Sequence, residues 1–320
     1  MSSSVRIVGR LNGVGIDRDA AIIAEVAGSC GLEPAISHHR SIGPLSRLAS
    51  HNRDRDDAII FLERVKSRWL GRADRFLLVP NQERFPKRLV HTLGRVDQVL
   101  VKTRHAEQIF SRHHPSVTRI GFTSVDRRLA RVQPDYARFF HLAGGSSLKG
   151  TETLLRVWAD HPAWPVLTVL QHRPGTVPDV PSNVELRREY VADDELMRMQ
   201  NTFGVHLCPS LSEGWGHSIV EAMSCGAMVV TTDGPPMNEL VGPDRGVLVP
   251  AARSEPRKLG VNYYVDPGAL ADAVEAVIAM PDARKAALGA AARSWFESND
   301  RAFREKLAAI LAPARAEATG

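Results

Sequence analysis

The chain has 320 residues, of which 43% are hydrophobic and 24% are charged, a composition typical of a soluble globular protein with enough material for two domains. No apolar run approaches the length that spans a bilayer, and residues 1–4 lack the apolar core of a signal peptide, so a cytoplasmic location is expected. The three cysteines, Cys30, Cys208 and Cys225, are widely spaced and odd in number, which excludes a disulfide framework and indicates reduced thiols that bind no metal.

The net charge of +5 conceals an asymmetry between the two halves of the chain. Residues 1–132 hold 23 Lys and Arg against 13 Asp and Glu, a difference of +10, and residues 133–320 hold the remaining 18 against 23, a difference of −5. A basic first half suits an anionic acceptor, an acidic membrane surface or nucleic acid. The alternative is a basic surface that is merely solvated.

The first half alternates strands with helices, which predicts a parallel sheet covered on both faces. A glycine turn over residues 12–15 separates the first strand from a helix over about 17–31, but a full GxGxxG spacing is absent, so no nicotinamide cofactor is expected. Glu63, Asn81 and Glu83 follow strands, at the sheet edge where ligands bind in such folds. The predicted strands are 5–9, 58–62, 76–80, 98–102 and 117–122.

Two stretches of the first half, residues 64–75 and 84–95, are both basic and apolar. The second has near-helical spacing and would begin at Pro86 at the earliest. Peripheral membrane helices have this composition, which makes membrane contact through 64–95 one interpretation. Core-facing helices with a solvated back have the same composition and are commoner.

The charged stretch 127–135 is predicted to be the linker between two domains. Beyond it, a strand over 139–143, a glycine loop over 144–148 and Lys149 precede a helix that runs to about 160, a pattern that suits a phosphate, with Lys149 acting as a point charge. A helix is expected to begin at Asp193 or Asp194 as its cap, residues 251–260 are interpreted as a polar insertion, and the chain is helical from 267 onward. Further strands are predicted at 166–170, 184–186, 205–208, 228–232 and 247–250.

The stretch 207–223 is the most informative part of the sequence. A buried strand ends in a proline, Gly214 and Gly216 flank Trp215, and a helix is expected to open at Ser218. Unshielded N–H groups at the positive end of a helix form an anion site. The carboxylates Glu213 and Glu221 would then accept hydrogen bonds from sugar or ribose hydroxyls. The alternative is a capping box, in which Glu221 only reaches back to the N–H of Ser218.

These motifs together resemble the retaining GT-B glycosyltransferases of glycosyltransferase family 4, also called glycosyl transferases group 1. The resemblance covers most of residues 138–250, including the segments 142–150, 209–226 and 229–241. It implies two Rossmann-like α/β domains with a cleft between them. The implied parts are 1–132 on the acceptor side, 133–297 for the nucleotide sugar, and a C-terminal helix over 298–320 that returns to the first domain.

The resemblance also implies roles for individual residues. Glu213 and Lys149 are the implied catalytic residues, and Glu63 is a candidate beside them, although an ion pair with a nearby arginine explains Glu63 equally well. His217 is a candidate hydrogen-bond donor to sugar or phosphate. The donor-binding residues are Gly13, Gly15, Gly145, Ser146, Lys149, Tyr190, Val191, Glu213, Gly214, Trp215, Gly216, His217, Ser218 and Glu221.

Two departures from the family pattern stand out. Gly145 and Ser146 occupy the place where relatives usually carry an arginine, and no histidine follows the strand that ends at Glu63. The expected activity is nonetheless metal-independent hexosyl transfer of the EC 2.4 type, without a cofactor, from a UDP- or GDP-sugar to a glycan, glycolipid or other anionic acceptor at the inner face of the membrane. A glycosyltransferase acting on modified DNA bases and a nucleotide-sugar binding protein without catalysis are the alternatives.

Overall fold

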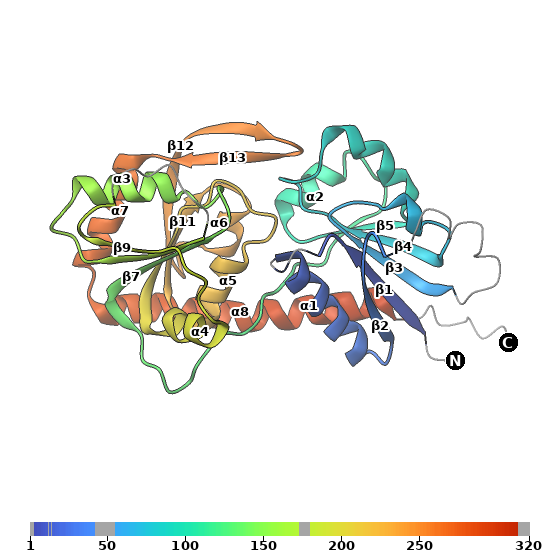
Figure 1. Cartoon of the computed structure of the whole chain (residues 1–320), viewed down its shortest axis with the longest axis horizontal. Coiled ribbons are helices and arrows are strands. Elements are labelled where there is room, and N and C mark those ends of the chain that lie inside the picture. The colour runs from blue at the N-terminus through green and yellow to red at the C-terminus, as the bar shows by residue number, and fades with distance from the viewer. Residues whose placement is uncertain (1–2, 12, 14, 42–54, 173–179, 313–320) are drawn as a thin grey trace. The chain divides into compact units, whose positions relative to one another are not determined.

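The computed structural model describes residues 3–11, 13, 15–41, 55–172 and 180–312. The chain divides into two compact units. Unit 1 comprises Met1–Thr123 and Asn299–Gly320, and unit 2 comprises Ser124–Ser298 (Figure 1). The predicted α/β class is confirmed, because each unit is built on a parallel or mainly parallel sheet flanked by helices.

Unit 1 contains a six-stranded sheet in which every neighbouring pair is parallel, in the order β2-β1-β3-β4-β5-β6. Five consecutive residues of the third strand, 58–62, are buried, as expected for a strand that is covered on both faces. The strands are β1 (Ser4–Gly9), β2 (Glu33–His38), β3 (Asp56–Leu62), β4 (Ala73–Val79), β5 (Gln98–Val101) and β6 (Val117–Arg119).

The helices of unit 1 are α1 (Gly15–Ser29), which packs on β1 and β2, α2 (Arg104–Phe110), and two 3₁₀ helices, η2 (Ser67–Trp69) and η3 (Lys87–Arg95). The amide of Leu89 donates to the carbonyl of Pro86, three residues back, which is the 3₁₀ spacing. Trp69 and Leu93 are buried. These large apolar side chains of the two basic stretches therefore face the interior of unit 1.

Unit 2 contains a seven-stranded sheet in the order β13-β12-β11-β10-β7-β8-β9. All neighbouring strands are parallel except β12 and the edge strand β13, which are antiparallel. Phe139, Trp158 and Val205 belong to an apolar core cluster of this unit. In chain order the elements are β7 (Asp135–Gly144), α3 (Thr151–Asp160), β8 (Leu167–Gln171), β9 (Val184–Arg187), α4 (Asp193–Thr202), β10 (Phe203–Cys208), α5 (His217–Cys225), β11 (Met228–Asp233), α6 (Met237–Leu240), β12 (Val247–Arg257), β13 (Gly260–Val265), α7 (Pro267–Ala279) and α8 (Asp282–Leu311).

The strand predicted to end at residue 250 continues, so residues 251–260, which were interpreted as a polar insertion, belong to a hairpin. They extend β12 to Arg257 and turn into β13, giving the antiparallel hairpin at the edge of the sheet (Figure 1). The guanidinium of Arg253 lies 3.7 Å from the ring centroid of Tyr264, and the Tyr264 hydroxyl donates to Glu255 over 2.9 Å. Residues 252–256 are exposed. The apolar alternation by which a strand is recognised is therefore missing.

The last helix, α8, is continuous, and its residues from Asn299 belong to unit 1. The Asn299 side chain donates to the carbonyl of Phe122 over 2.7 Å, and the rings of Phe303 and Phe122 lie 4.8 Å apart. The guanidinium of Arg75 donates to the carbonyl of Ile310 over 2.7 Å. None of the helices in the described ranges is long and apolar enough to cross a membrane.

Candidate functional site

Two loops of unit 2 lie side by side because β7 and β10 are neighbours and parallel. The amide of Leu211 donates to the carbonyl of Leu148 over 2.8 Å, which joins the loop after β10 to the loop after β7. Gly150 has a left-handed φ of 73°, and a Cβ atom on it would overlap the carbonyl oxygen of Pro209. Glycine at position 150 therefore lets the two backbones touch at the carboxyl edge of the sheet.

Lys149 is held between two of the residues predicted to bind the donor. Its Nζ donates to Glu213 Oε1 over 2.6 Å and to Ser218 Oγ over 2.9 Å. The Lys149 and Glu213 side chains are 16% and 12% exposed, so the ion pair is shielded but reachable from solvent. The structure thus brings together the predicted cation, the first predicted carboxylate and the start of α5.

Gly216 is the N-cap of α5, with a φ of 108°, and no side chain caps the helix. The amides of Ile219 and Val220 donate to the Gly216 carbonyl, so the N–H groups of His217 and Ser218 form the outermost turn at the positive end of the helix. The capping-box alternative is wrong. Ser218 lies inside the helix with its hydroxyl bonded to Lys149, and the Glu221 carboxylate bonds elsewhere.

Glu221 is only 1% exposed and belongs to a chain of buried polar contacts. Its Oε2 accepts from Gln200 Nε2 over 3.0 Å, and Gln200 Oε1 accepts from Arg127 Nε over 2.8 Å. The Arg127 guanidinium also donates to the Asp193 carboxylate over 2.9 and 2.8 Å. The helix α4 begins at Asp193, but neither Asp193 nor Asp194 is its cap, because the N-cap is Ala192 and no side chain caps the helix.

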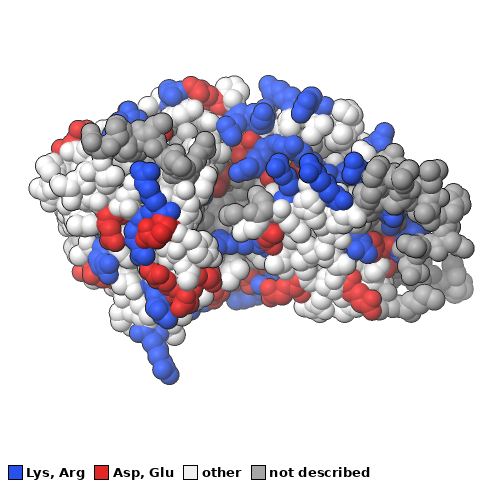
Figure 2. Space-filling model, viewed as in Figure 1, with Lys and Arg blue, Asp and Glu red and all other residues white. Residues whose placement is uncertain are grey.

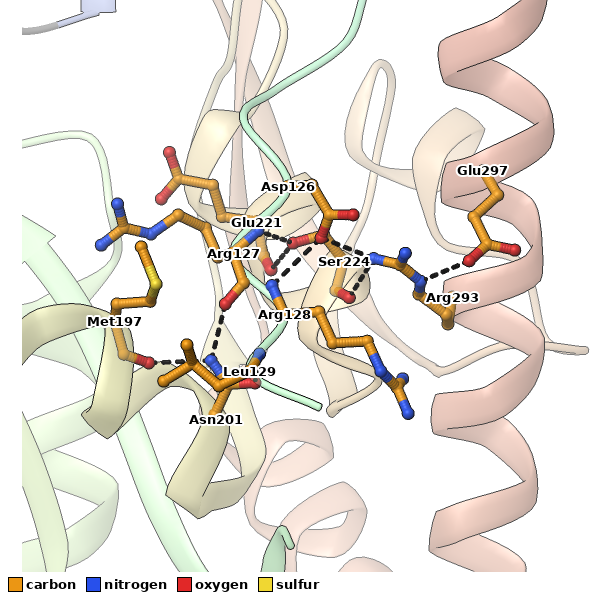
Figure 3. Close-up of polar contacts among 10 residues, drawn as sticks. All are labelled: Asp126, Arg127, Arg128, Leu129, Met197, Asn201, Glu221, Ser224, Arg293 and Glu297. Atoms are coloured by element: carbon orange, nitrogen blue, oxygen red, sulfur yellow. Dashed lines mark hydrogen bonds and ion pairs between the residues drawn. The ribbon is translucent and has the colours of Figure 1, made fainter. Parts of the chain in front are cut away.

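The segment predicted to be a linker, 127–135, is instead anchored to unit 2 at its start, and the boundary between the units falls earlier, at Ser124. Figure 3 shows the Arg127 amide bonded to the hydroxyl of Ser224 on α5, and the Asn201 side chain bonded to the Arg127 carbonyl, over 3.0 and 2.7 Å. From α8, Arg293 donates to Asp126 over 2.6 Å. The prediction failed because these partners lie 70 or more residues away in the sequence.

Ser124, which sequence reasoning missed, touches two predicted donor-binding residues. Its hydroxyl oxygen accepts from Trp215 Nε1 over 3.3 Å and lies 2.8 Å from His217 Nδ1. Trp215 is buried, so the glycine loop is fixed by this side chain. No local pattern marks Ser124 in the sequence, because both partners lie more than 90 residues downstream.

The remaining predicted residues of unit 2 lie on other loops of the same sheet. Gly145 and Ser146 follow β7, and the Ser146 amide donates to the Ala143 carbonyl. Tyr190 lies between β9 and α4, is 82% exposed, and stacks on His172 with a centroid distance of 6.2 Å. Val191 is buried, so only its backbone is suited to contact a ligand.

Gly13, Gly15 and Glu63 belong to unit 1. Gly13 has a φ of 76° and donates its amide to Asp17 over 2.8 Å, Gly15 opens α1, and residues 12 and 14 of the same turn lie outside the described residues. Glu63 follows β3 and is one of two non-glycine residues with positive φ in the described part of the chain. Its Oε1 lies 3.9 Å from Arg84 Nε.

Beneath the paired loops, burial lowers the pKa of His141 to about 4, so this imidazole is neutral. Its Nδ1 donates to the Leu207 carbonyl over 2.7 Å, which leaves Nε2 to accept from the Thr151 hydroxyl over 2.9 Å. His141 therefore ties β7 to β10 and to α3. Burial also raises the pKa of Cys208 to about 12, which keeps it a thiol. The described residues include no group of three His, Cys, Asp or Glu side chains suited to hold a metal ion.

Two Rossmann-like units, with a lysine, a carboxylate and a glycine-capped helix at the strand ends of the second, define a GT-B glycosyltransferase fold. Solved structures agree. Sucrose-phosphate synthase from Thermosynechococcus elongatus is similar with a TM-score of 0.73 and 16% identity over 96% of this chain and 98% of that chain. HepE of Anabaena, solved in complex with UDP and glucose, is similar with a TM-score of 0.71 and 13% identity over 97% of this chain and 99% of that chain.

A third similar structure is WaaG, a glycosyltransferase involved in lipopolysaccharide biosynthesis, with a TM-score of 0.67 and 14% identity over 97% of this chain and 100% of that chain. Residues 188–295 match the family model of glycosyl transferases group 1, and the resemblance noted in the sequence is confirmed. A search of curated proteins gives no significant match. The matched segment includes the loop and helix around Glu213 and Glu221, and it supports glycosyl transfer as the activity.

Proposed function

We propose that this protein is a retaining glycosyltransferase that moves a sugar from a nucleoside-diphosphate sugar to a hydroxyl acceptor. The observation that carries the proposal is the position of Lys149, whose ammonium bonds both Glu213 and Ser218 at the start of α5. A diphosphate placed there would meet a cation and the positive end of a helix. A sugar bound beside it would meet a carboxylate.

Breaking the bond between the sugar and the diphosphate leaves negative charge on the leaving phosphate. Fixed donors that face this charge stabilise the transition state. Lys149 Nζ and the N–H groups of Gly216, His217 and Ser218 are suited to do so, with Gly145 and Ser146 on the neighbouring loop as further contacts. We therefore propose that transfer needs neither a divalent ion nor a cofactor.

The two carboxylates would take different hydroxyl groups. Glu213, partly exposed on the loop, would accept from the sugar, while Glu221, held by Gln200, would accept from the ribose. The Ser124 hydroxyl lies 2.8 Å from His217 Nδ1 and orients the imidazole, which we propose contacts the sugar or the phosphate. The nucleotide base of the donor would lie near the backbone of Tyr190 and Val191.

Retention follows if the acceptor hydroxyl attacks from the face that the phosphate leaves, since the departing phosphate can then take the hydroxyl proton. Two similar structures are named as complexes with UDP and a sugar, the HepE complex and a pneumococcal O-GlcNAc transferase with UDP and GlcNAc, which supports UDP as the carrier. The WaaG name supports a glycan or glycolipid acceptor. Synthesis at the cytoplasmic face of a membrane would fit this acceptor.

The test starts with a thermal-shift panel of UDP-, GDP- and ADP-sugars, because a ligand that binds the folded state raises its melting temperature. Calorimetry then measures the affinity of the selected nucleoside diphosphate for the unaltered protein, for Lys149→Met and for the control Arg156→Met. The control removes an exposed cation of α3 in the same unit. We expect Lys149→Met to weaken binding about tenfold or more and Arg156→Met to leave it unchanged.

Chemistry is followed by donor hydrolysis without acceptor, with and without EDTA. We expect slow hydrolysis that EDTA does not alter and that Glu213→Gln reduces strongly while the melting temperature is kept. Equal affinity of Lys149→Met and the unaltered protein for the diphosphate would contradict the assigned site. Absence of binding for every nucleotide sugar would contradict the proposed function.

A further inference from the structure

A second group of polar side chains lies in unit 1, at the carboxyl ends of four neighbouring strands. Arg10 follows β1, His39 follows β2, Glu63 follows β3 and Asn81 comes just beyond β4. The His39 amide donates to the Gly9 carbonyl over 2.8 Å and the Glu63 amide to the Val79 carbonyl over 2.9 Å, which fixes both residues to this edge. Open parallel sheets bind their ligands at this edge.

Four buried polar atoms at this edge have no hydrogen-bond partner among the described residues: His39 Nδ1, Glu63 Oε1, Arg64 Nε and Asn81 Oδ1. More than nine in ten buried polar groups of folded proteins are hydrogen-bonded, and each exception is destabilising. A group of four such atoms on adjoining loops is therefore unusual. Hydroxyl groups of a ligand would satisfy the carboxylate, the amide oxygen and the imidazole together.

The backbone of Glu63 adds a second sign of a built site. Its φ of 61° is left-handed, a conformation that is unfavourable for a non-glycine residue. The Glu63 amide nevertheless keeps its bond to β4, and its carboxylate is 13% exposed. Strain of this kind clusters at ligand sites.

The charges around these atoms are mainly positive. Burial lowers the pKa of Lys66, and the nearby guanidinium groups of Arg64, Arg10 and Arg40 lower it further, while only Glu63 acts in the opposite direction. Burial, Lys66, His38 and Arg40 together lower the pKa of the His39 imidazole to about 4. Basic side chains are also concentrated over unit 1 in the view of Figure 2. Cations that repel one another at close range are stabilised by a bound anion.

We propose that this edge of unit 1 binds the acceptor, and that the acceptor carries a phosphate ester beside its hydroxyl groups. Arg64, Arg40 and Lys66 would hold the phosphate, whose oxygens accept several charge-assisted hydrogen bonds. Glu63 and Asn81 would accept from the hydroxyls. The identification of this ligand as the acceptor rests on the transferase activity proposed above, whereas the phosphate site itself does not.

The test uses calorimetry with glucose 6-phosphate, glucose and inorganic phosphate on the full chain. We expect glucose 6-phosphate to bind at least tenfold more tightly than either of the others, because only it offers both phosphate and hydroxyls. Lys66→Gln should weaken this binding about tenfold. Glu63→Gln should weaken it less, which provides a second variant should Lys66→Gln fail to fold. Lys87→Gln, which removes an exposed cation of η3, serves as the control.

Histidine NMR locates the binding. Bound phosphate should raise the pKa of His39 from about 4, since an anion then offsets Lys66 and Arg40. Phosphatidylcholine vesicles with and without phosphatidic acid distinguish a lipid phosphate from a soluble one. Vesicle binding that depends on Lys66 and exceeds binding of the soluble ester assigns the site to a lipid headgroup. Equal loss in Lys87→Gln, or equal affinity for glucose and its phosphate, would overturn the proposal.

Failure of this site and failure of the transferase activity can be told apart. A nucleoside diphosphate that binds in a Lys149-dependent manner, while no phosphate ester or vesicle binds, refutes the phosphate site and keeps the proposed function. Binding of the ester that depends on Lys66, in a protein that binds no nucleotide sugar, supports the phosphate site and refutes the acceptor role.

Discussion

Replacement of Arg127 by methionine tests whether the buried chain of contacts behind Glu221 serves donor binding. Methionine keeps the apolar stem of Arg127 but removes the N–H group that donates to Gln200 Oε1. Gln200 is only 1% exposed, so water cannot replace this donor. An unmet buried acceptor costs about 1–3 kcal/mol. The Asp193 carboxylate is 64% exposed and contributes at most about 1 kcal/mol. The free energy of unfolding should therefore fall by about 1–4 kcal/mol.

For a unit of this size such a loss lowers the melting temperature by roughly 2–16 °C. Urea denaturation measures the stability, and calorimetry measures UDP against 2′,3′-dideoxy-UDP. If Gln200 positions Glu221 for the ribose, Arg127→Met should weaken UDP several-fold and leave the dideoxy analogue unaffected. Arg128→Met, which alters the exposed neighbour, is the control. An equal loss for both nucleotides would show that Arg127 stabilises the fold without positioning Glu221, and would refute the reasoning.

Two further predictions concern the foundation of the site. Gly150→Ala should destabilise unit 2 by more than 1 kcal/mol, because φ is left-handed and the new Cβ would push the loop after β7 away from Pro209; urea midpoints measure this, with Gly145→Ala, where a Cβ meets no atom within 4 Å, as control. Burial lowers the pKa values of His141 and His206 to about 4 in the folded state, against about 6.5 in the unfolded state. Below pH 6.5 the unfolded state therefore takes up protons that the folded state does not. The free energy of unfolding should fall by about 1.4 kcal/mol per pH unit and per histidine as the pH drops from 6.5 toward 4. Urea midpoints between pH 7.5 and 4.5 that do not fall would contradict this, and His141→Gln should reduce the slope.

The central parts of the fold and site were predictable because local patterns specify them. Apolar runs such as 58–62 and 228–230 are typical of strands in a covered sheet, and the glycines beside Trp215 mark a loop before a helix. Lys149 and Glu213 were each predicted from the local motif around them, and short-range chemistry was sufficient for these features. Their ion pair joins residues 64 apart in the sequence and was not predicted.

The missed features depend on contacts between distant residues. Arg127 appeared to belong to a charged linker because a sequence does not show that Gln200 and Asp193 await its guanidinium. The β12–β13 hairpin was missed because its outer residues are polar on both faces. The basic stretch 84–95 has helical spacing, yet three-residue spacing closes its turns as a 3₁₀ helix. In each case the partner, and not the local pattern, decides the structure.

The bond between Lys149 and Glu213 has a consequence for ligand discrimination. A ligand that approaches Lys149 competes with a carboxylate only 2.6 Å from the ammonium. Inorganic phosphate that binds Lys149 would displace Glu213 and leave its carboxylate without a hydrogen-bond donor. A sugar diphosphate would bind Lys149 through its phosphate and donate hydrogen bonds to Glu213 from the sugar hydroxyls. The Glu213 carboxylate thus competes with simple anions for Lys149. Unit 2 should therefore bind inorganic phosphate weakly and favour ligands that satisfy both Lys149 and Glu213.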